Sequence, residues 1–262
     1  YFNDVYKFEP YIELAAKYIV AYDLQNALQR LKFSDPAAGV KVLNECVDKM
    51  RQESMSDSFL SRLKNYHRAS NKNYKELVAY SDALFERYSR LLVLRVDLSY
   101  LTQHSKIDQL EAKQHRKRLF ENTRSNKLFA DMVGYVWKLE HGASKGFHFH
   151  VMFFFDGSKV REDGTIAQQI GKYWANLITS GKGMYYNCNA VKHRYQSCGI
   201  GMIRHGDDEL RDGLRKAIIY LTKTDFYMKL QSVGRCMGKG TRPCKKDARG
   251  RPRRDVTPVD SN

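Results

Sequence analysis

The hydrophobic periodicity of the chain changes near Arg90, and this change divides the sequence into two parts. Between residues 10 and 90, apolar side chains recur every three or four positions, which is typical of amphipathic helices. From Leu92 to Leu98, every second residue is leucine or valine, which indicates a strand with one face on a core. The sequence therefore predicts a helical N-terminal region, residues 1–90, followed by a domain that contains a sheet.

Helix-start signals refine the N-terminal prediction. Ser34, Asp35 and Pro36 form a typical helix start, with proline in the first turn. A further helix is expected to begin at Asp57 and to extend toward Tyr88, with a break at residues 71–73. No strand is expected between residues 10 and 90.

Strands and helices alternate in the second part. The pattern predicts helices at residues 106–129, 165–180 and 207–231, and further strands at residues 132–139, 146–155 and 199–204. This order favours an α+β domain at residues 91–234, in which an antiparallel sheet is flanked by helices. Residues 235–262 are expected to form a basic, flexible tail, because glycine and proline there oppose a fixed helix.

A candidate metal site lies in the predicted hairpin. His148 and His150 are two apart on a strand, so their rings share one face. Glu140 ends the preceding strand, and a turn between the two strands would bring its carboxylate beside the imidazoles. Two imidazoles and one carboxylate leave positions open for substrate and water, as a catalytic metal site requires. His141, directly after Glu140, is the alternative third ligand.

A second candidate group lies on the last predicted helix. Tyr220 and Lys223 are three residues apart and would be neighbours on a helix, where they can address one phosphate together. Tyrosine can act as a nucleophile that forms a phosphotyrosyl ester and conserves the energy of the cleaved bond. A neutral phenol is a weak nucleophile, so a nearby metal would assist this attack. Tyr227 is a possible second nucleophile, although core packing is also consistent with its position.

The charge of the chain favours a polyanionic partner. Lysine and arginine outnumber aspartate and glutamate by 45 to 29, a net charge of +16. No apolar run is long enough to span a membrane. Nucleic acid is therefore the expected partner. Candidate DNA-binding residues come from the predicted helix at 106–129 and from the tail: Lys113, Arg116, Arg118, Arg235, Lys239, Lys245 and Lys246.

Cysteine usage indicates the compartment. The five cysteines are an odd number and include no Cys-x-x-Cys pair, which argues against a disulfide framework. The expected location is a reducing cytoplasm. A zinc site formed by Cys188, Cys198 and a nearby histidine is conceivable, but the spacing matches no standard module.

Together these residues resemble the HUH family of replication initiator endonucleases. In that family, two histidines around a hydrophobic residue and an upstream acid bind a divalent metal, and a Tyr-x-x-Lys helix carries the nucleophile. The segment from Leu91 to about Gly240 is more specifically similar to the replication proteins of filamentous phages and related prophage elements. The stretches that carry the likeness are residues 93–99, 140–150, 220–225 and 238–240.

The resemblance implies a fold and an activity. The sheet would be an HUH/RRM-like palm, and the protein would nick single-stranded DNA at a replication origin. Tyr220 would take the 5′-phosphate, Lys223 would hold the scissile phosphate, and Glu140, His148 and His150 would bind Mg²⁺ or Mn²⁺. The released 3′-hydroxyl would prime rolling-circle synthesis. The sequence contains no phosphate-binding Gly-x-x-x-x-Gly-Lys-Ser/Thr loop, so a host helicase and DNA polymerase are the expected partners.

Two other classes compete with this interpretation. A DNA-binding regulator descended from a nickase would retain the charge but lose the metal or tyrosine function. A cupin-type metal barrel would share the His148-Phe149-His150 motif and the glycine before it. It would also require an acid four or five residues after His150, where Phe154 and Phe155 stand instead.

Overall fold

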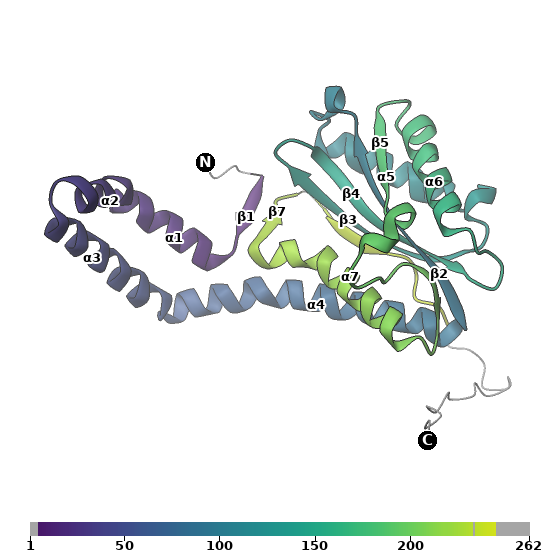
Figure 1. The fold of residues 1–262 in the computed structure, drawn as a ribbon, viewed down its shortest axis with the longest axis horizontal. Coiled ribbons are helices and arrows are strands. Elements are labelled where there is room, and N and C mark those ends of the chain that lie inside the picture. Colours follow the sequence, from purple (N-terminus) through teal and green to yellow (C-terminus); the bar gives the residue numbers. More distant parts are fainter. Residues whose placement is uncertain (1–4, 233, 245–262) are drawn as a thin grey trace, which may run out of the picture. The chain divides into compact units, whose positions relative to one another are not determined.

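The computed structural model describes residues 5–232 and 234–244, which form two compact units. One unit contains the described residues up to Asn73 together with Thr222–Gln231. The other contains Tyr74–Leu221 and the described residues that follow Gln231. The helices α4 (Asp57–Arg87) and α7 (Asp208–Tyr227), labelled in Figure 1, contribute residues to both units.

The N-terminal unit is mainly helical. Its other elements are α1 (Pro10–Ala21), α2 (Leu24–Phe33), α3 (Pro36–Ser54), and the antiparallel pair β1 (Tyr6–Phe8) and β7 (Met228–Leu230). Helix α3 starts as predicted, because the Asp35 carboxylate accepts a hydrogen bond from the Ala38 amide at 3.0 Å. The rings of Tyr11 and Phe59 meet edge to face, with 4.9 Å between centroids.

The predicted break at residues 71–73 is wrong, because α4 is continuous from Asp57 to Arg87. Within the N-terminal unit, the Ser70 hydroxyl donates a hydrogen bond of 2.9 Å to the Asp225 carbonyl. This contact between distant segments supports the helix where its asparagines are poor helix formers. The two compact units nevertheless divide between Asn73 and Tyr74, inside the same helix.

The second unit contains an open, antiparallel, six-stranded sheet with helices on both faces. Its strands are β2 (Arg90–Tyr100), β3 (Met132–Gly142), β4 (Gly146–Asp156), β5 (Gly183–Asn187), β6 (Gly201–Arg204) and β8 (Met237–Lys239). Its own helices are α5 (Gln109–Asn122) and α6 (Asp163–Tyr173), with short turns η1 (Thr102–His104), η2 (Lys127–Phe129), η3 (Trp174–Ile178) and η4 (Asn189–Arg194). The predicted α+β class with an N-terminal helical region is confirmed.

The strand order is β5-β2-β4-β3-β8, and β6 also pairs with β2. Strand β2 is long enough to pair with two strands, β6 and β5, along one edge. Its first residues pair with β6, with Leu92 opposite Met202, and its last residues pair with β5, with Leu98 opposite Tyr185. On its other edge β2 pairs with β4 over most of its length, with Val93 opposite Phe154.

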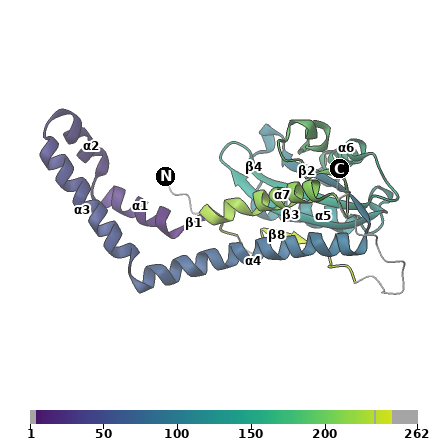
Figure 2. The same ribbon diagram turned by 60° about the horizontal axis from the view of Figure 1, so that its bottom comes forward.

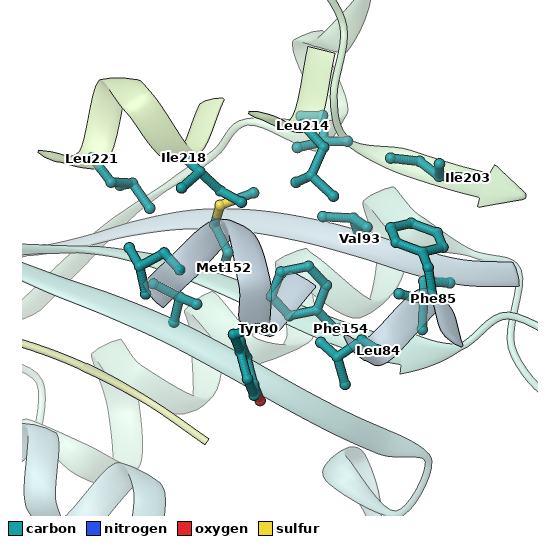
Figure 3. Close-up of a cluster of buried hydrophobic side chains, with 14 of the residues drawn as sticks. Tyr80, Leu84, Phe85, Val93, Met152, Phe154, Ile203, Leu214, Ile218 and Leu221 are labelled. Carbon is teal, nitrogen blue, oxygen red and sulfur yellow. The ribbon is translucent and has the colours of Figure 1, made fainter. Parts of the chain in front are cut away.

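One face of the sheet packs against α4 and α7. Val93, Met152 and Phe154 from the strands join Tyr80 and Leu84 of α4 in a buried cluster, which α7 closes (Figure 3). The α7 side chains in this cluster are Leu214, Ile218 and Leu221, all at most 1% exposed. We call this the α4/α7 face. Side chains two apart on a strand share a face, so it continues along β2 through Arg95 and Asp97.

The opposite face packs against α5, α6 and the turns beside them, and we call it the α5/α6 face. Phe149 meets Trp174 with 5.9 Å between ring centroids, and Phe153 meets Phe129 at 6.0 Å. The Tyr100 hydroxyl is 3.0 Å from Nδ1 of His115 on α5. Most residues of β2 and β4 are buried because apolar side chains on both faces of the sheet are covered. The prediction that only one face of β2 meets a core is therefore wrong.

Several predicted boundaries differ from the structure. Helix α6 ends at Tyr173 and continues as a π-helical turn to Ile178, and β5 was not predicted. Helix α7 ends at Tyr227, because Met228–Leu230 pairs with β1. The start of the predicted flexible tail is also ordered: Met237–Lys239 forms β8, which pairs with Val136–Lys138 on the edge of β3 opposite β4 (Figure 2). Residues 245–262 lie outside the described residues.

The open sheet excludes the cupin barrel that the histidine motif had raised, because a barrel has no free edges. No helix within residues 5–232 and 234–244 is long and apolar enough to cross a membrane.

A close backbone contact fixes α7 against the segment that precedes β6. A Cβ atom built on Gly213 would lie 2.0 Å from the Cys198 carbonyl oxygen. We expect Gly213→Ala to lower the free energy of unfolding by about 1–3 kcal/mol, because the backbones must separate. Urea denaturation measures this. Gly206→Ala is the control, since nothing lies within 4 Å of the added atom. Equal stability of the two variants would contradict the prediction.

Candidate metal centre and the adjacent tyrosine

The β3–β4 hairpin brings together the three residues predicted to bind a metal. Glu140 pairs directly with His148, and Lys138 with His150, so all four side chains lie on one face. The turn between the strands ends at Gly146, which has φ +62°. A Cβ at Gly146 would lie 2.0 Å from the Ser105 carbonyl oxygen, so this position requires glycine.

The three potential ligand atoms converge. They lie within 4.8 Å of one another. Oε2 of Glu140 is 3.4 Å from Nε2 of His150 and 3.9 Å from Nε2 of His148. Adjacent ligands of an octahedral ion with bonds of about 2.1 Å lie about 3 Å apart, so small side-chain movements would close the site around a cation. The side chains are 13–20% exposed, which leaves one side open to a substrate.

The second nitrogen of each ring supports the fit to a metal. Nδ1 of His148 lies 3.1 Å from the Gly146 carbonyl oxygen, which accepts its proton. Nδ1 of His150 lies 2.8 Å from Oδ1 of Asp97. Both rings are therefore oriented with Nε2 toward Glu140. Metal-binding histidines commonly show this arrangement, with the remote nitrogen held by a carbonyl or carboxylate.

The two histidines have opposite pKa shifts. Burial lowers the pKa of His148 below its usual value. Burial also acts to lower the pKa of His150, but hydrogen bonds to Asp97 and Glu140 outweigh it and raise this pKa to about 9. Despite burial, the pKa of Asp97 lies below its usual value because His150 and Arg95 stabilise the carboxylate. Without a metal, His150 is therefore charged at neutral pH, which compensates the nearby acids.

This protonation predicts how metal binding depends on pH. His150 must lose its Nε2 proton to become a ligand, so Mn²⁺ should displace about one proton at pH 7. The apparent affinity should rise about tenfold per pH unit as the pH approaches 9, the metal-free pKa of His150. Calorimetry in buffers of different ionisation enthalpy measures the proton release. Asp97→Asn should reduce the proton release, because Asp97 raises the pKa of His150. Binding of Mn²⁺ without proton release in the wild type would contradict the prediction.

Two side chains of β2 connect the triad to Tyr220. Asp97, which holds His150, also accepts from Nε of Arg95 at 3.2 Å. The guanidinium of Arg95 lies over the Tyr220 ring, with 5.2 Å from its central carbon to the ring centroid. Tyr220 is 59% exposed, so its phenol is accessible to a ligand. Tyr220 thus lies on the same face of the sheet as the candidate metal ligands.

The other predicted helix residues are placed differently. Lys223 is exposed on the next turn of α7, where the helix enters the N-terminal unit. Tyr227 is 56% exposed, and its carbonyl accepts from the Glu9 amide in that unit. His141 faces away from the triad, with its ring 4.7 Å from that of Phe147. The strand alternation therefore favours Glu140 over His141 as third ligand.

The predicted DNA-binding residues do not gather around the triad. Arg116 lies over Trp137, 4.2 Å from the ring centroid, on the α5/α6 face. Arg118 on the same helix donates to the Ile178 carbonyl, and Lys113 bonds to Ser232. Lys239 on β8 pairs with Glu76 at 3.1 Å, and Arg235 is exposed. Lys245 and Lys246 lie outside the described residues.

Arg95 and Asp97 had no assigned role in the sequence prediction. The sequence nevertheless contains a signal for them, because two opposite charges two residues apart in an apolar strand must lie on the same face. The side chains of Arg95 and Asp97 are only 14% and 25% exposed, so both charges require partners. The zinc alternative has no support among residues 5–232 and 234–244, where the only cluster with ligand geometry is Glu140, His148 and His150.

The fold and site define the second unit as an α+β domain with a candidate metal triad beside an exposed tyrosine. The family comparison places the chain more specifically. The model for the YagK/YfjJ C-terminal domain matches residues 54–240, so the chain belongs to this family. No curated protein and no solved structure matches it significantly.

Proposed function

We propose that this chain is a metal-dependent DNA nickase and strand transferase that initiates rolling-circle replication. The observation that carries the proposal is the shared location of two chemical groups. The triad of Glu140, His148 and His150 and the accessible Tyr220 lie on one face of the sheet, linked through Asp97 and Arg95. The likeness of these residues to the HUH motifs supports the same function.

In the proposed reaction, Tyr220 is the nucleophile. The Tyr220 hydroxyl attacks the phosphorus of a phosphodiester in single-stranded DNA and forms a phosphotyrosyl ester. The bond from phosphorus to the 3′ oxygen of the preceding nucleotide breaks. The phenol loses its proton to solvent, and the departing oxygen gains one to become a 3′-hydroxyl. Attack by a 3′-hydroxyl on the ester reverses these steps and rejoins the strand.

The charges around Tyr220 suit this chemistry. Arg95 lies between the phenol ring and Asp97 and can hold a phosphate beside Tyr220. A divalent cation held by the triad, Mg²⁺ or Mn²⁺, would withdraw charge from the non-bridging phosphate oxygens. Lys223 is proposed to contact the scissile phosphate or the phosphotyrosine. A host helicase would unwind the duplex, and a host DNA polymerase would extend the released 3′-hydroxyl.

The proposal is tested by covalent trapping. Single-stranded oligonucleotides tiled across the replicon that carries the gene are incubated with the protein and Mn²⁺. We expect an SDS-resistant protein–DNA adduct from a few of them, and none when excess chelator is present. Salt-sensitive binding without any adduct would contradict the proposal and indicate a DNA-binding regulator instead.

A further inference from the structure

A pocket of about 410 Å³ lies beside Tyr220, between α7 and the segment that leads into β6. Its lining includes Arg95 from β2, Tyr195 and Ile200 from the segment before β6, and Lys216, Ala217 and Tyr220 from α7. The volume is within the range of about 300–1,000 Å³ typical of small-ligand sites. We call it the Tyr195 pocket.

The walls of this pocket are closely packed. Gly199 approaches Gly213 so closely that a Cβ atom on Gly199 would lie 2.2 Å from the Gly213 carbonyl carbon. The Tyr195 hydroxyl interacts with the Cys188 thiol, and Cys188 is 1% exposed, so the tyrosine is anchored at its polar end. Its ring remains accessible, because Tyr195 is 39% exposed. The pocket is therefore preformed rather than a gap between loose side chains.

The lining combines positive charge with accessible aromatic rings. Arg95 and Lys216 are cations, and Lys216 donates to the Ser197 hydroxyl at 3.2 Å. Asp97, the acid bonded to Arg95, also holds His150, so its charge is shared between two cations. Tyr195 and Tyr220 contribute exposed rings. Cations for phosphate and aromatic rings for stacking are the combination that binds single-stranded nucleic acid.

We propose that the Tyr195 pocket binds one nucleotide of single-stranded DNA and thereby selects which phosphodiester reaches Tyr220. The base stacks on the Tyr195 ring, and Lys216 contacts a backbone phosphate. Because Tyr220 lines the same pocket, the phosphate of the bound nucleotide or of its neighbour lies beside the phenol. This inference rests on the proposed nickase function and adds to it the element that positions the strand.

Binding of a fluorescent single-stranded DNA of mixed sequence, measured by anisotropy with chelator present, tests the pocket separately from cleavage. Tyr195→Ala should raise Kd at least about fivefold, the lower end for loss of one base–aromatic stack. Tyr195→Phe retains the ring but loses the contact with Cys188, so it should lose less affinity than Tyr195→Ala. Lys216→Gln should weaken binding more than Lys172→Gln, which removes an exposed lysine from α6 on the other face.

Photo-crosslinking of the wild-type protein provides a readout that does not depend on variant folding. Strands that carry 5-iodouracil should crosslink within the peptide that contains Tyr195 or Tyr220. Crosslinks only elsewhere, or equal Kd for Tyr195→Ala and wild type, would overturn the pocket proposal. Pocket-dependent binding without a covalent adduct in Mn²⁺ would support the pocket and contradict the nickase. If an adduct forms and both pocket variants bind single-stranded DNA with wild-type affinity, the result would support the nickase and contradict the pocket.

Discussion

Replacement of Tyr220 by phenylalanine should abolish the covalent protein–DNA adduct. The amount of adduct should fall at least about 100-fold, to below the detection limit of the assay. The substitution removes only the hydroxyl, and without it no phosphotyrosyl ester can form. The ring remains over Arg95, so the fold and the single-strand affinity should change little. The adduct is measured on denaturing gels with labelled oligonucleotides and Mn²⁺.

Tyr227→Phe is the matched control, because Tyr227 is also an exposed tyrosine of α7. It lies in the N-terminal unit, and we expect its variant to form the adduct at the wild-type rate. An adduct that persists in Tyr220→Phe but disappears in Tyr227→Phe would assign the nucleophile to Tyr227. An adduct that persists in the double variant Tyr220→Phe/Tyr227→Phe would refute a tyrosine nucleophile on α7.

Removal of a triad side chain should have the second large effect. We expect His148→Ala and Glu140→Gln to weaken Mn²⁺ binding by more than about 100-fold. Loss of a residue that only hydrogen-bonds to a metal ligand already lowers the metal affinity about 10–100-fold, and loss of a ligand itself should cost more. Adduct formation should fall with metal binding. Calorimetry measures the affinity directly, so the loss of metal is separated from any loss of DNA binding.

His141→Ala is the control for these variants. His141 is adjacent to Glu140 in sequence, but it faces the other side of the strand, against Phe147. Its replacement should leave the affinity for Mn²⁺ within about twofold of wild type, since its ring lies against Phe147 on the other side of the strand. A large loss in His141→Ala together with normal binding in Glu140→Gln would reverse the assignment of the third ligand.

Much of the fold follows from local patterns in the sequence. The alternation in β2, the Asp35 helix start and the hairpin that aligns Glu140 with His148 were all predicted, because each depends on residues close together in the chain. Element ends were predicted less well. Helix α7 stops at Tyr227 because the next three residues pair with β1, more than 200 positions away in sequence.

The sequence by itself determined which residues we propose as functional, through the spacing of His148, His150, Tyr220 and Lys223. Only the tertiary structure decided which of them meet. The packing of Ile218 and Leu221 against the α4/α7 face brings Tyr220 over Arg95, and strand register brings Asp97 to His150. The packing of α5 places Arg116 on the opposite face, over Trp137. Spacing within one helix or hairpin is local, whereas the face on which a helix packs depends on contacts between distant segments.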